Sequence, residues 1–207
     1  MADRVDSATA ISGEPGRRLR WLPLGYPIGA WNQTTDRDAN QTAIVRNNAR
    51  LVHVGFAQYD TWMRLRIEGD LARTLPQDGV AAPADVEALT ALGLLLELPE
   101  SPPEALSTLD GLILTACGIG AGNLPERPEQ FVIVTHRFEF VAALDAVSYA
   151  VWARCGAGAS LGAACRAAAA GSSLPIESVT GAVVRSLPAM VASGAVFAEH
   201  GGIADGP

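Results

Sequence analysis

The sequence predicts an α+β fold made of two tandem copies of one small unit. Two observations carry this prediction: an Ile-Gly-Ala-x-Asn motif that begins at Ile28 and again at Ile119, and a Tyr-x-x-Trp pair that recurs about ninety residues later. Similarity at a fixed spacing is the signature of a repeated structural unit. The predicted division is a flexible tail at 1–19, a first unit at 20–98, a Pro-rich linker at 99–112, a second unit at 113–199 and a flexible tail at 200–207.

Length and composition favour a globular protein with room for two small cores. The chain has 207 residues, of which 49% are hydrophobic and 18% are charged. Its formal net charge of -7 repels polyphosphate and argues against nucleic acid as a partner. The N-terminus lacks the features of a signal peptide, and no apolar run is long enough to span a membrane. We therefore expect a cytoplasmic protein without membrane contact.

The cysteines and histidines do not form a pattern that binds a metal or a cofactor. Cys117, Cys155 and Cys165 lack the Cys-x-x-Cys spacing of zinc or redox sites. The segment Gly118 to Gly122 resembles a dinucleotide loop, but the following helix and the distal acid are missing. We predict no cofactor and no metal.

The repeated motif is predicted to form a structural turn at the start of each unit. Gly29 and Gly120 provide the conformational freedom of such a turn. We expect Asn32 and Asn123 to close it by hydrogen bonds from the side chain to the backbone, because asparagine commonly makes them in turns.

A β-hairpin is predicted to follow each turn. Asn47-Asn48 favours a tight connection in the first unit, because asparagine tolerates positive φ, and Thr135 to Arg137 connects the strands of the second. The predicted strands are 43–45 and 51–54 in the first unit, and 131–134 and 138–141 in the second.

A helix with an aromatic pair is predicted after each hairpin. Tyr59 and Trp62 lie 90 residues before Tyr149 and Trp152, and each pair has the i to i+3 spacing that places two side chains on one helix face. We expect these four residues to be core anchors.

Each unit is predicted to end with an amphipathic helix, a glycine and a short apolar strand. Gly93 and Gly194 stand where a left-handed helix end is common, and an apolar run follows each of them. Between the units, three prolines fall within residues 99–103, and we expect them to exclude regular structure from the linker. A hairpin, about three helices and a closing strand form a winged-helix-like unit.

The second unit resembles the small PqqD-like winged-helix proteins, which recognise precursor peptides during the biosynthesis of ribosomally made, modified peptides. The residues that carry the resemblance are Phe138 to Trp152, Ile176 to Leu187 and Ala192 to Phe197. The resemblance implies a non-catalytic adaptor that presents a peptide or partner protein to a modifying enzyme. In this mode an extended peptide adds to the exposed edge of the hairpin, and the neighbouring helix supplies pockets.

The resemblance selects candidate residues on both hairpins and on the last helix. The candidates for partner binding are Leu51, His53, Phe138, Phe140, Val183 and Arg185. A structural alternative exists for the aromatic pair, since alternate residues of a half-buried strand face the core. Phe138 and Phe140 would then be core residues rather than binding residues.

Two other functions remain open from the sequence. A DNA-binding regulator of winged-helix type needs basic residues on the third helix, where the second unit offers Arg185 against Glu177. A small enzyme without a recognisable motif is the third possibility, although His53, His136 and His200 are scattered along the chain.

Overall fold

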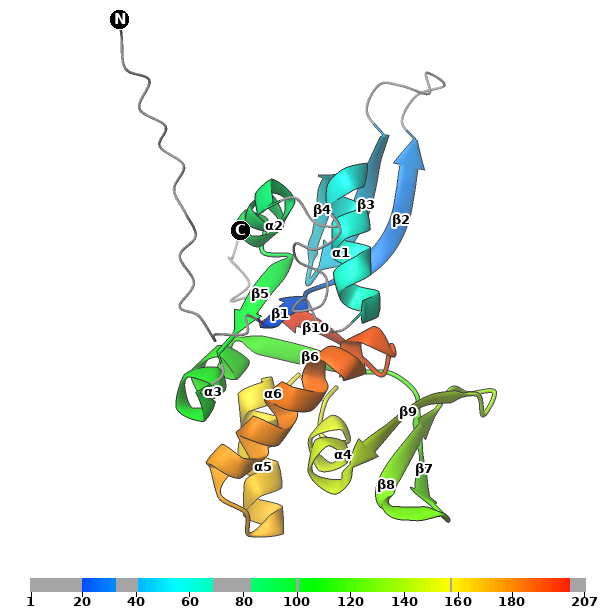
Figure 1. Cartoon of the computed structure of the whole chain (residues 1–207), viewed down its shortest axis with the longest axis vertical. Coiled ribbons are helices and arrows are strands. Elements are labelled where there is room, and N and C mark those ends of the chain that lie inside the picture. Colours follow the sequence, from blue (N-terminus) through cyan, green and yellow to red (C-terminus); the bar gives the residue numbers. More distant parts are fainter. Residues whose placement is uncertain (1–19, 33–40, 69–82, 100, 157, 202–207) are drawn as a thin grey trace, which may run out of the picture.

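The computed structural model describes residues 20–32, 41–68, 83–99, 101–156 and 158–201, and it shows an α+β protein (Figure 1). Within these residues six helices accompany ten strands, and the strands form small antiparallel sheets. No helix in this part of the chain is both long enough and apolar enough to cross a membrane.

The first half contains a three-stranded meander and a separate pair of strands. Its elements are β1 (Arg20–Pro23), β2 (Tyr26–Asn32), β3 (Gln41–Asn47), β4 (Arg50–Gly55), α1 (Phe56–Glu68), α2 (Pro83–Ala91) and β5 (Leu95–Leu98). Strands β2, β3 and β4 pair in sequence order, whereas β1 pairs with β5. The first half therefore starts and ends in the same two-stranded sheet.

The second half repeats this strand arrangement, but among the described residues it has one additional helix before its first strand and three helices instead of two before its closing strand. Its elements are α3 (Pro102–Asp110), β6 (Leu112–Ala116), β7 (Ile119–Leu124), β8 (Arg127–Val134), β9 (Phe140–Asp145), α4 (Ala146–Trp152), α5 (Leu161–Ser172), α6 (Ile176–Ala192) and β10 (Val196–His200). Strands β7, β8 and β9 form a meander, and β6 pairs with β10.

A glycine at the start of each meander occupies the same environment in both halves. Gly25 and Gly118 have φ values of 96° and 98°. A Cβ atom at Gly25 would lie 2.5 Å from the carbonyl oxygen of Arg46, and one at Gly118 would lie 2.7 Å from that of Val134. Both positions therefore require glycine for backbone conformation and for space.

The register of the repeat differs from the one predicted by the Ile-Gly-Ala-x-Asn motif. Gly29 pairs with Ile44 and Gly122 pairs with Val132, each after a bulge and each with positive φ. Gly29 thus corresponds to Gly122 and not to Gly120. The motif therefore aligns the two halves two residues away from their structural alignment. Equivalent positions in the two halves share a backbone geometry and not a residue type.

The predicted turn at this motif is wrong, since both copies of the motif lie in strands. Gly29 and Asn32 belong to β2, and Gly120 and Asn123 belong to β7. Each strand has a bulge instead of the turn, and a glycine of positive φ follows the bulge, at Gly29 and at Gly122. The Asn123 side-chain amide does donate to a backbone carbonyl, that of Pro128, across the turn between β7 and β8.

Each predicted hairpin is the second and third strand of a meander. The first strand of each meander was not predicted; β7, for example, consists of Ile-Gly-Ala-Gly-Asn-Leu and resembles a loop in composition. Strand β1 and its pairing with β5 were not predicted either. In the turn between β3 and β4, Asn48 takes the positive φ of 57°, while Asn47 belongs to β3.

Residues 99–112 are not an irregular linker, because they contain α3. Pro102 and Pro103 stand in its first turn, where the missing amide hydrogens cost no helical hydrogen bond. Ala105 and Leu109 are buried in the core of the second half. The prolines start this helix instead of preventing it.

The two halves pack directly on each other. Leu22, Leu24 and Leu98 of the first half belong to the core of the second half. The rings of Tyr26 and Phe197 stack with centroids 3.8 Å apart across the contact. The strands β1 and β10 lie side by side at the centre of Figure 1, where the backbone nitrogen of Gly25 donates to the carbonyl oxygen of Ala198 at 2.7 Å.

Candidate functional site

A groove of about 260 Å³ lies between the edge strand β9 and the helix α6. β9 pairs with β8 alone among the described strands, so its other edge has no strand partner there. Residues 140–145 form one wall of the groove. The residues that α6 contributes are Ser186, Ala189, Met190 and Ser193, the last of which is the C-cap.

Hydrogen bonds around Asp145 fix the helices beside this strand. The Asp145 carboxylate caps α4 by accepting hydrogen bonds from the backbone nitrogens of Val147 and Ser148, at 2.9 and 3.0 Å. The Ser148 hydroxyl donates to the same carboxylate at 2.8 Å and lies 2.9 Å from the Ser186 hydroxyl on α6. The end of β9, the start of α4 and the middle of α6 are thereby linked.

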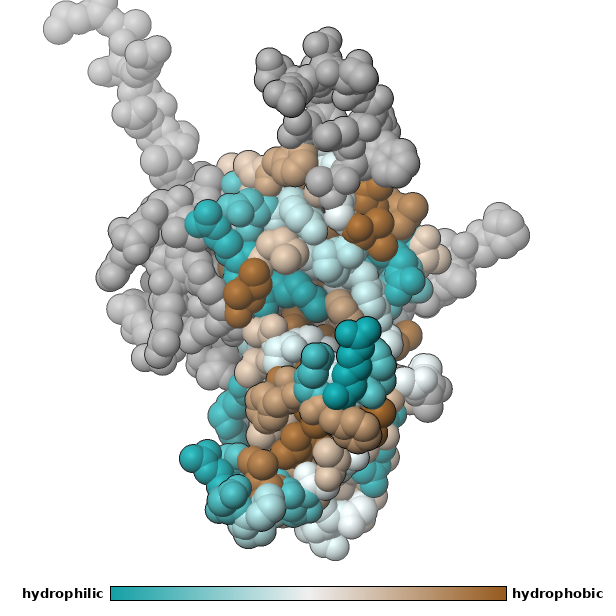
Figure 2. All heavy atoms as spheres, turned by 90° about the vertical axis from the view of Figure 1, so that its right-hand side faces the viewer, coloured by the Kyte–Doolittle hydropathy of each residue, from teal (hydrophilic) through white to brown (hydrophobic). Residues whose placement is uncertain are grey.

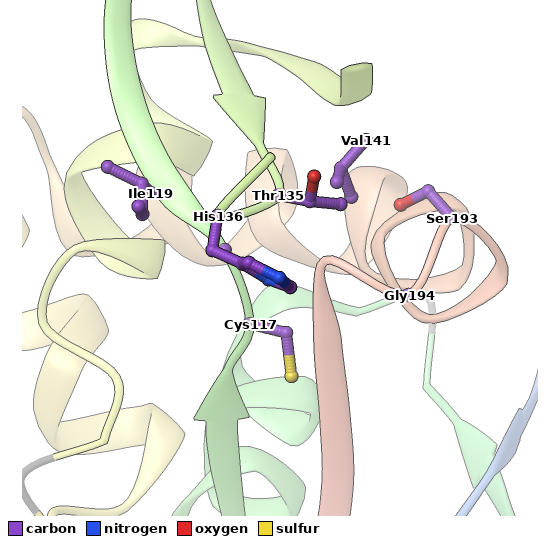
Figure 3. A pocket seen from close by; sticks show the side chains of 8 residues that line it. Cys117, Ile119, Thr135, His136, Val141, Ser193 and Gly194 are labelled. Carbon is purple, nitrogen blue, oxygen red and sulfur yellow. The ribbon is translucent and has the colours of Figure 1, made fainter. Parts of the chain in front are cut away.

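A second cavity, of about 470 Å³, adjoins the groove and shares Val141 and Ser193 with it. In Figure 3 the His136 ring extends toward the side on which Cys117 lies, and Ser193 approaches from the end of α6. The full lining is Cys117, Gly118, Ile119, Thr135, His136, Val141, Ser193 and Gly194. The groove and this cavity adjoin and together form one candidate site.

The turn between β8 and β9 presents Phe138 to solvent. Phe138 has a φ of 63°, a conformation that glycine or asparagine usually adopts, and its side chain is 80% exposed. Its backbone nitrogen donates to the Thr135 carbonyl at 3.0 Å, and the Thr135 hydroxyl accepts from the backbone nitrogens of Arg137 and Glu139. A compact turn thus holds an apolar side chain in an unfavourable conformation without burying it.

Phe140 begins β9 and is 66% exposed. The alternative that Phe138 and Phe140 face the core is therefore wrong. The expectation that both lie on one strand is also wrong, because Phe138 belongs to the turn. Hydrophobic side chains gather on the lower half of the face in Figure 2, on the side of the molecule where the β7-β8-β9 sheet lies. Phe140 alone of the two lines the groove.

The remaining binding candidates do not gather around one site. Leu51 and His53 are exposed on β4, in the other half of the molecule. Arg185 is exposed on α6. Val183 is only 2% exposed and packs in the core, so it is not available to a partner. The periodicity of α6 explains this correction, because its buried face includes Val179, Val183 and Leu187.

The four aromatic residues predicted as core anchors lie in or against the two cores. Trp62 and Trp152 are buried, while Tyr59 and Tyr149 pack against the cores from partly buried positions. Each tyrosine stacks on the tryptophan of its own helix, with centroid distances of 6.0 and 5.5 Å.

The thiols of the second half are held in their protonated form. Burial raises the pKa values of Cys155 and Cys165 to about 12. Burial also raises the pKa of Cys117, although the positive charge of Arg66 opposes that rise. Thiolate is the nucleophilic form, so these values do not favour nucleophilic chemistry. In the part of the chain that the structure describes, no group of three or more His, Cys, Asp or Glu residues is placed to hold a metal ion.

The helical wall of the groove is not among the residues predicted from the sequence. Ser186, Ala189, Met190 and Ser193 have the spacing i, i+3, i+4 and i+7, which places them on one face of a helix. This spacing was a usable signal, because the two serines and the alanine at these positions are small and leave room beside a strand. Comparisons with protein-family models, with curated proteins and with solved structures find no match for this chain.

Proposed function

We propose that this chain is a non-catalytic adaptor that binds an extended peptide, or an extended segment of a partner protein, along β9. In this proposal the two halves are winged-helix-like units, and the peptide is a precursor that a modifying enzyme acts on. The observation that carries the proposal is the edge of β9 that no described strand occupies, beside the groove that α6 completes. The repeated order of elements supports the tandem arrangement.

The edge of β9 supplies the main-chain part of such an interface. An added strand satisfies the backbone groups of an edge, and alternate side chains of the peptide then enter pockets beside it. The α6 wall is suited to receive them, because Ser186, Ala189 and Ser193 have small side chains that leave room beside β9. Phe140 provides an exposed aromatic contact at one end.

The second half fits this function better than the first. The spacing of 90 residues that relates Trp62 to Trp152 also places His53 at the position of Ala143. The imidazole of His53 leaves less room for a peptide at β4 than the methyl group of Ala143 leaves at β9. We therefore assign the peptide to β9 and not to the equivalent edge of the first half.

A selection from random linear peptides tests the proposal, with an arginine placed in the groove as the diagnostic variant. The probe is a displayed library of ~12-residue peptides, long enough to span a strand of ordinary length. Ala189→Arg obstructs the groove from an exposed position. Ala88→Arg is the matched control, because Ala88 precedes Gly93 by the same number of residues as Ala189 precedes Gly194.

The proposal expects enriched peptides that bind the unmodified chain and the Ala88→Arg variant but lose at least about tenfold in affinity for Ala189→Arg, a loss that corresponds to ~1.4 kcal/mol. Circular dichroism must show that both variants are folded. Peptides that bind all three proteins equally, or a library that yields no binder, would overturn it.

A further inference from the structure

The last strand of the second half packs on the first half, at the point where the first meander begins. The residues that make this contact are 197–200, called here the β10 segment. The Phe197 ring stacks on Tyr26, with centroids 3.8 Å apart. The next carbonyl, that of Ala198, accepts a hydrogen bond from the backbone nitrogen of Gly25 at 2.7 Å. An extended chain with an aromatic side chain thus covers the start of this meander.

The rest of the β10 segment contacts the turn between β3 and β4 and the glycine that follows α2. The Glu199 carboxylate accepts a hydrogen bond from the backbone nitrogen of Asn48 at 2.7 Å. The backbone nitrogen of His200 donates to the Asn47 side chain at 3.4 Å, and a Cβ atom on Gly93 would lie 3.8 Å from the His200 ring. The β10 segment therefore contacts one patch of the first half, which consists of Gly25, Tyr26, Asn47, Asn48 and Gly93.

Each residue of this patch has an equivalent in the second half. The glycines that start the two meanders correspond to each other, as their shared backbone environment shows. Tyr26, the residue after the first of them, pairs with Arg46. Ile119, the residue after the second, pairs with Val134. The two turn residues that follow each partner therefore correspond, and so do the glycines of positive φ before the two closing strands. In the same order as the patch, the equivalents are Gly118, Ile119, Thr135, His136 and Gly194.

All five equivalents line the cavity of about 470 Å³ (Figure 3). Among the described residues, no carbonyl outside the β7-β8-β9 sheet accepts a hydrogen bond from the backbone nitrogen of Gly118, whereas that of Gly25 has Ala198. The Ile119 side chain is 50% exposed, although its counterpart Tyr26 is covered by the Phe197 ring. A cavity thus stands in the second half where the β10 segment stands in the first.

We propose that this cavity binds an extended segment of the peptide in the way that the first half binds the β10 segment. A large apolar side chain of the peptide contacts Ile119, and the carbonyl of the next residue accepts a hydrogen bond from the backbone nitrogen of Gly118. Val141 and Ser193 line both the groove and the cavity, so the same chain continues beside β9. The inference deepens the proposed function by naming a residue that the peptide carries, and it rests on that function only for the continuation along β9.

One contact of the β10 segment is not reproduced in the second half. The Glu199 carboxylate lies 3.9 Å from the Arg46 guanidinium, but the equivalent of Arg46 is Val134. Ile119 in turn provides apolar contact area where Tyr26 provides an aromatic face. The feature that the cavity recognises is therefore the large apolar side chain, and an acidic residue two positions after it is dispensable.

A hexapeptide with the sequence of residues 195–200, acetyl-Ala-Val-Phe-Ala-Glu-His-amide, tests this inference on the full chain. The amide signals of Gly118 and Gly25 are followed by NMR during the titration. The Gly118 signal should shift and saturate with a dissociation constant of ~1 mM or tighter, as the burial of one aromatic side chain and one or two hydrogen bonds provide. The Gly25 signal should stay in place, because Ala198 already accepts from this nitrogen.

Two altered hexapeptides test which side chain is recognised. Serine in place of the phenylalanine should weaken binding by at least about tenfold, because it removes the apolar contact. Glutamine in place of the glutamate should change the affinity by less than about twofold, since it keeps an acceptor oxygen and loses only a charge that no cation faces. A large loss with glutamine, or none with serine, overturns the assignment of the recognised residue.

Ile119→Ser is the diagnostic protein variant, and it should weaken the unaltered hexapeptide by at least about fivefold. Ile28→Ser is the matched control, because Ile28 is 57% exposed on the first strand of the other meander, and it should bind as the unmodified chain does. Circular dichroism must show that both variants are folded. Equal binding by both variants, or no saturable shift of the Gly118 signal in the unmodified chain, overturns the inference.

The same signal distinguishes a peptide from a second copy of the chain. A Gly118 signal that shifts with protein concentration before any peptide is added would show that a second copy enters the cavity, and it would overturn the peptide as the occupant. The library selection depends on Ala189 in the groove, whereas this experiment depends on Gly118 and Ile119 in the cavity. The inference and the proposed function can therefore fail separately.

Discussion

The indole nitrogens of Trp62 and Trp152 donate to equivalent backbone carbonyls in the two halves. Trp62 donates to Leu94 at 3.2 Å, and Trp152 donates to Ala195 at 3.0 Å. Each acceptor directly follows a glycine with positive φ, at Gly93 and Gly194. The same hydrogen bond therefore ties the first helix after each meander to the start of its closing strand.

Trp152→Phe should lower the free energy of unfolding by about 1 kcal/mol, because it removes a buried hydrogen bond and leaves a carbonyl with one partner fewer. Trp152→Ala should cost about 3 to 5 kcal/mol through the cavity that it leaves. Trp62→Phe and Trp62→Ala should behave alike. Urea denaturation followed by circular dichroism measures these changes. A loss below ~1 kcal/mol for either alanine variant would show that the tryptophan is not a core anchor.

Leu109→Ala tests whether α3 is part of the core. Leu109 is fully buried, so its truncation should cost about 2 to 5 kcal/mol. Ser107→Ala is the control, since Ser107 is exposed on the same helix and its change should cost less than about 0.5 kcal/mol. Equal stability of the two variants would contradict the packing of α3.

Phe138→Asn should raise the free energy of unfolding by about 0.5 to 1 kcal/mol, because asparagine tolerates the left-handed conformation better than phenylalanine does. The exposed ring contributes little burial that could be lost. Phe140→Asn is the control, since Phe140 has no positive φ and should give no gain. A loss of stability in Phe138→Asn would show that the ring contributes contacts in the folded state.

His200 should make the protein less stable at mildly acidic pH. Burial lowers the pKa of His200 below its ordinary value of 6.5, so the unfolded chain takes up a proton more readily than the folded chain. The free energy of unfolding should therefore fall as the pH drops through about 6.5, and this part of the pH dependence should be absent in His200→Gln. Identical pH profiles for the two proteins would contradict the assignment.

The parts of the fold that the sequence predicted depend on residues with strong local preferences. The α+β class follows from runs such as Phe131 to Val134, and the two helices with Tyr-x-x-Trp follow from matched aromatic spacing. Gly93 and Gly194 mark the helix ends because their backbone conformation disfavours other residues. Local chemistry was sufficient for these elements.

The parts that escaped prediction depend on tertiary contacts. The strand β7 has little strand propensity, and its pairing with β8 determines its conformation. Pro102 and Pro103 were interpreted as breaking helical structure, although the burial of Leu109 favours a helix behind them. Of the residues that line the groove, Phe140 was predicted from the sequence as a binding residue. The α6 wall was not, although its residues share one helix face in the sequence, because only the fold brings that face beside β9.

Hydrogen exchange of the β9 amides tests the central claim most directly. The peptide that the library selection enriches most is added at saturating concentration, and the exchange of each backbone amide is followed by NMR. An added strand pairs with the outward-facing amides of residues 140–145, so their exchange should slow by at least about tenfold while the amides of β4, at Arg50–Gly55, stay unchanged. Protection confined to β4, or no protection on β9 despite saturation, would contradict the assignment of β9 as the docking edge.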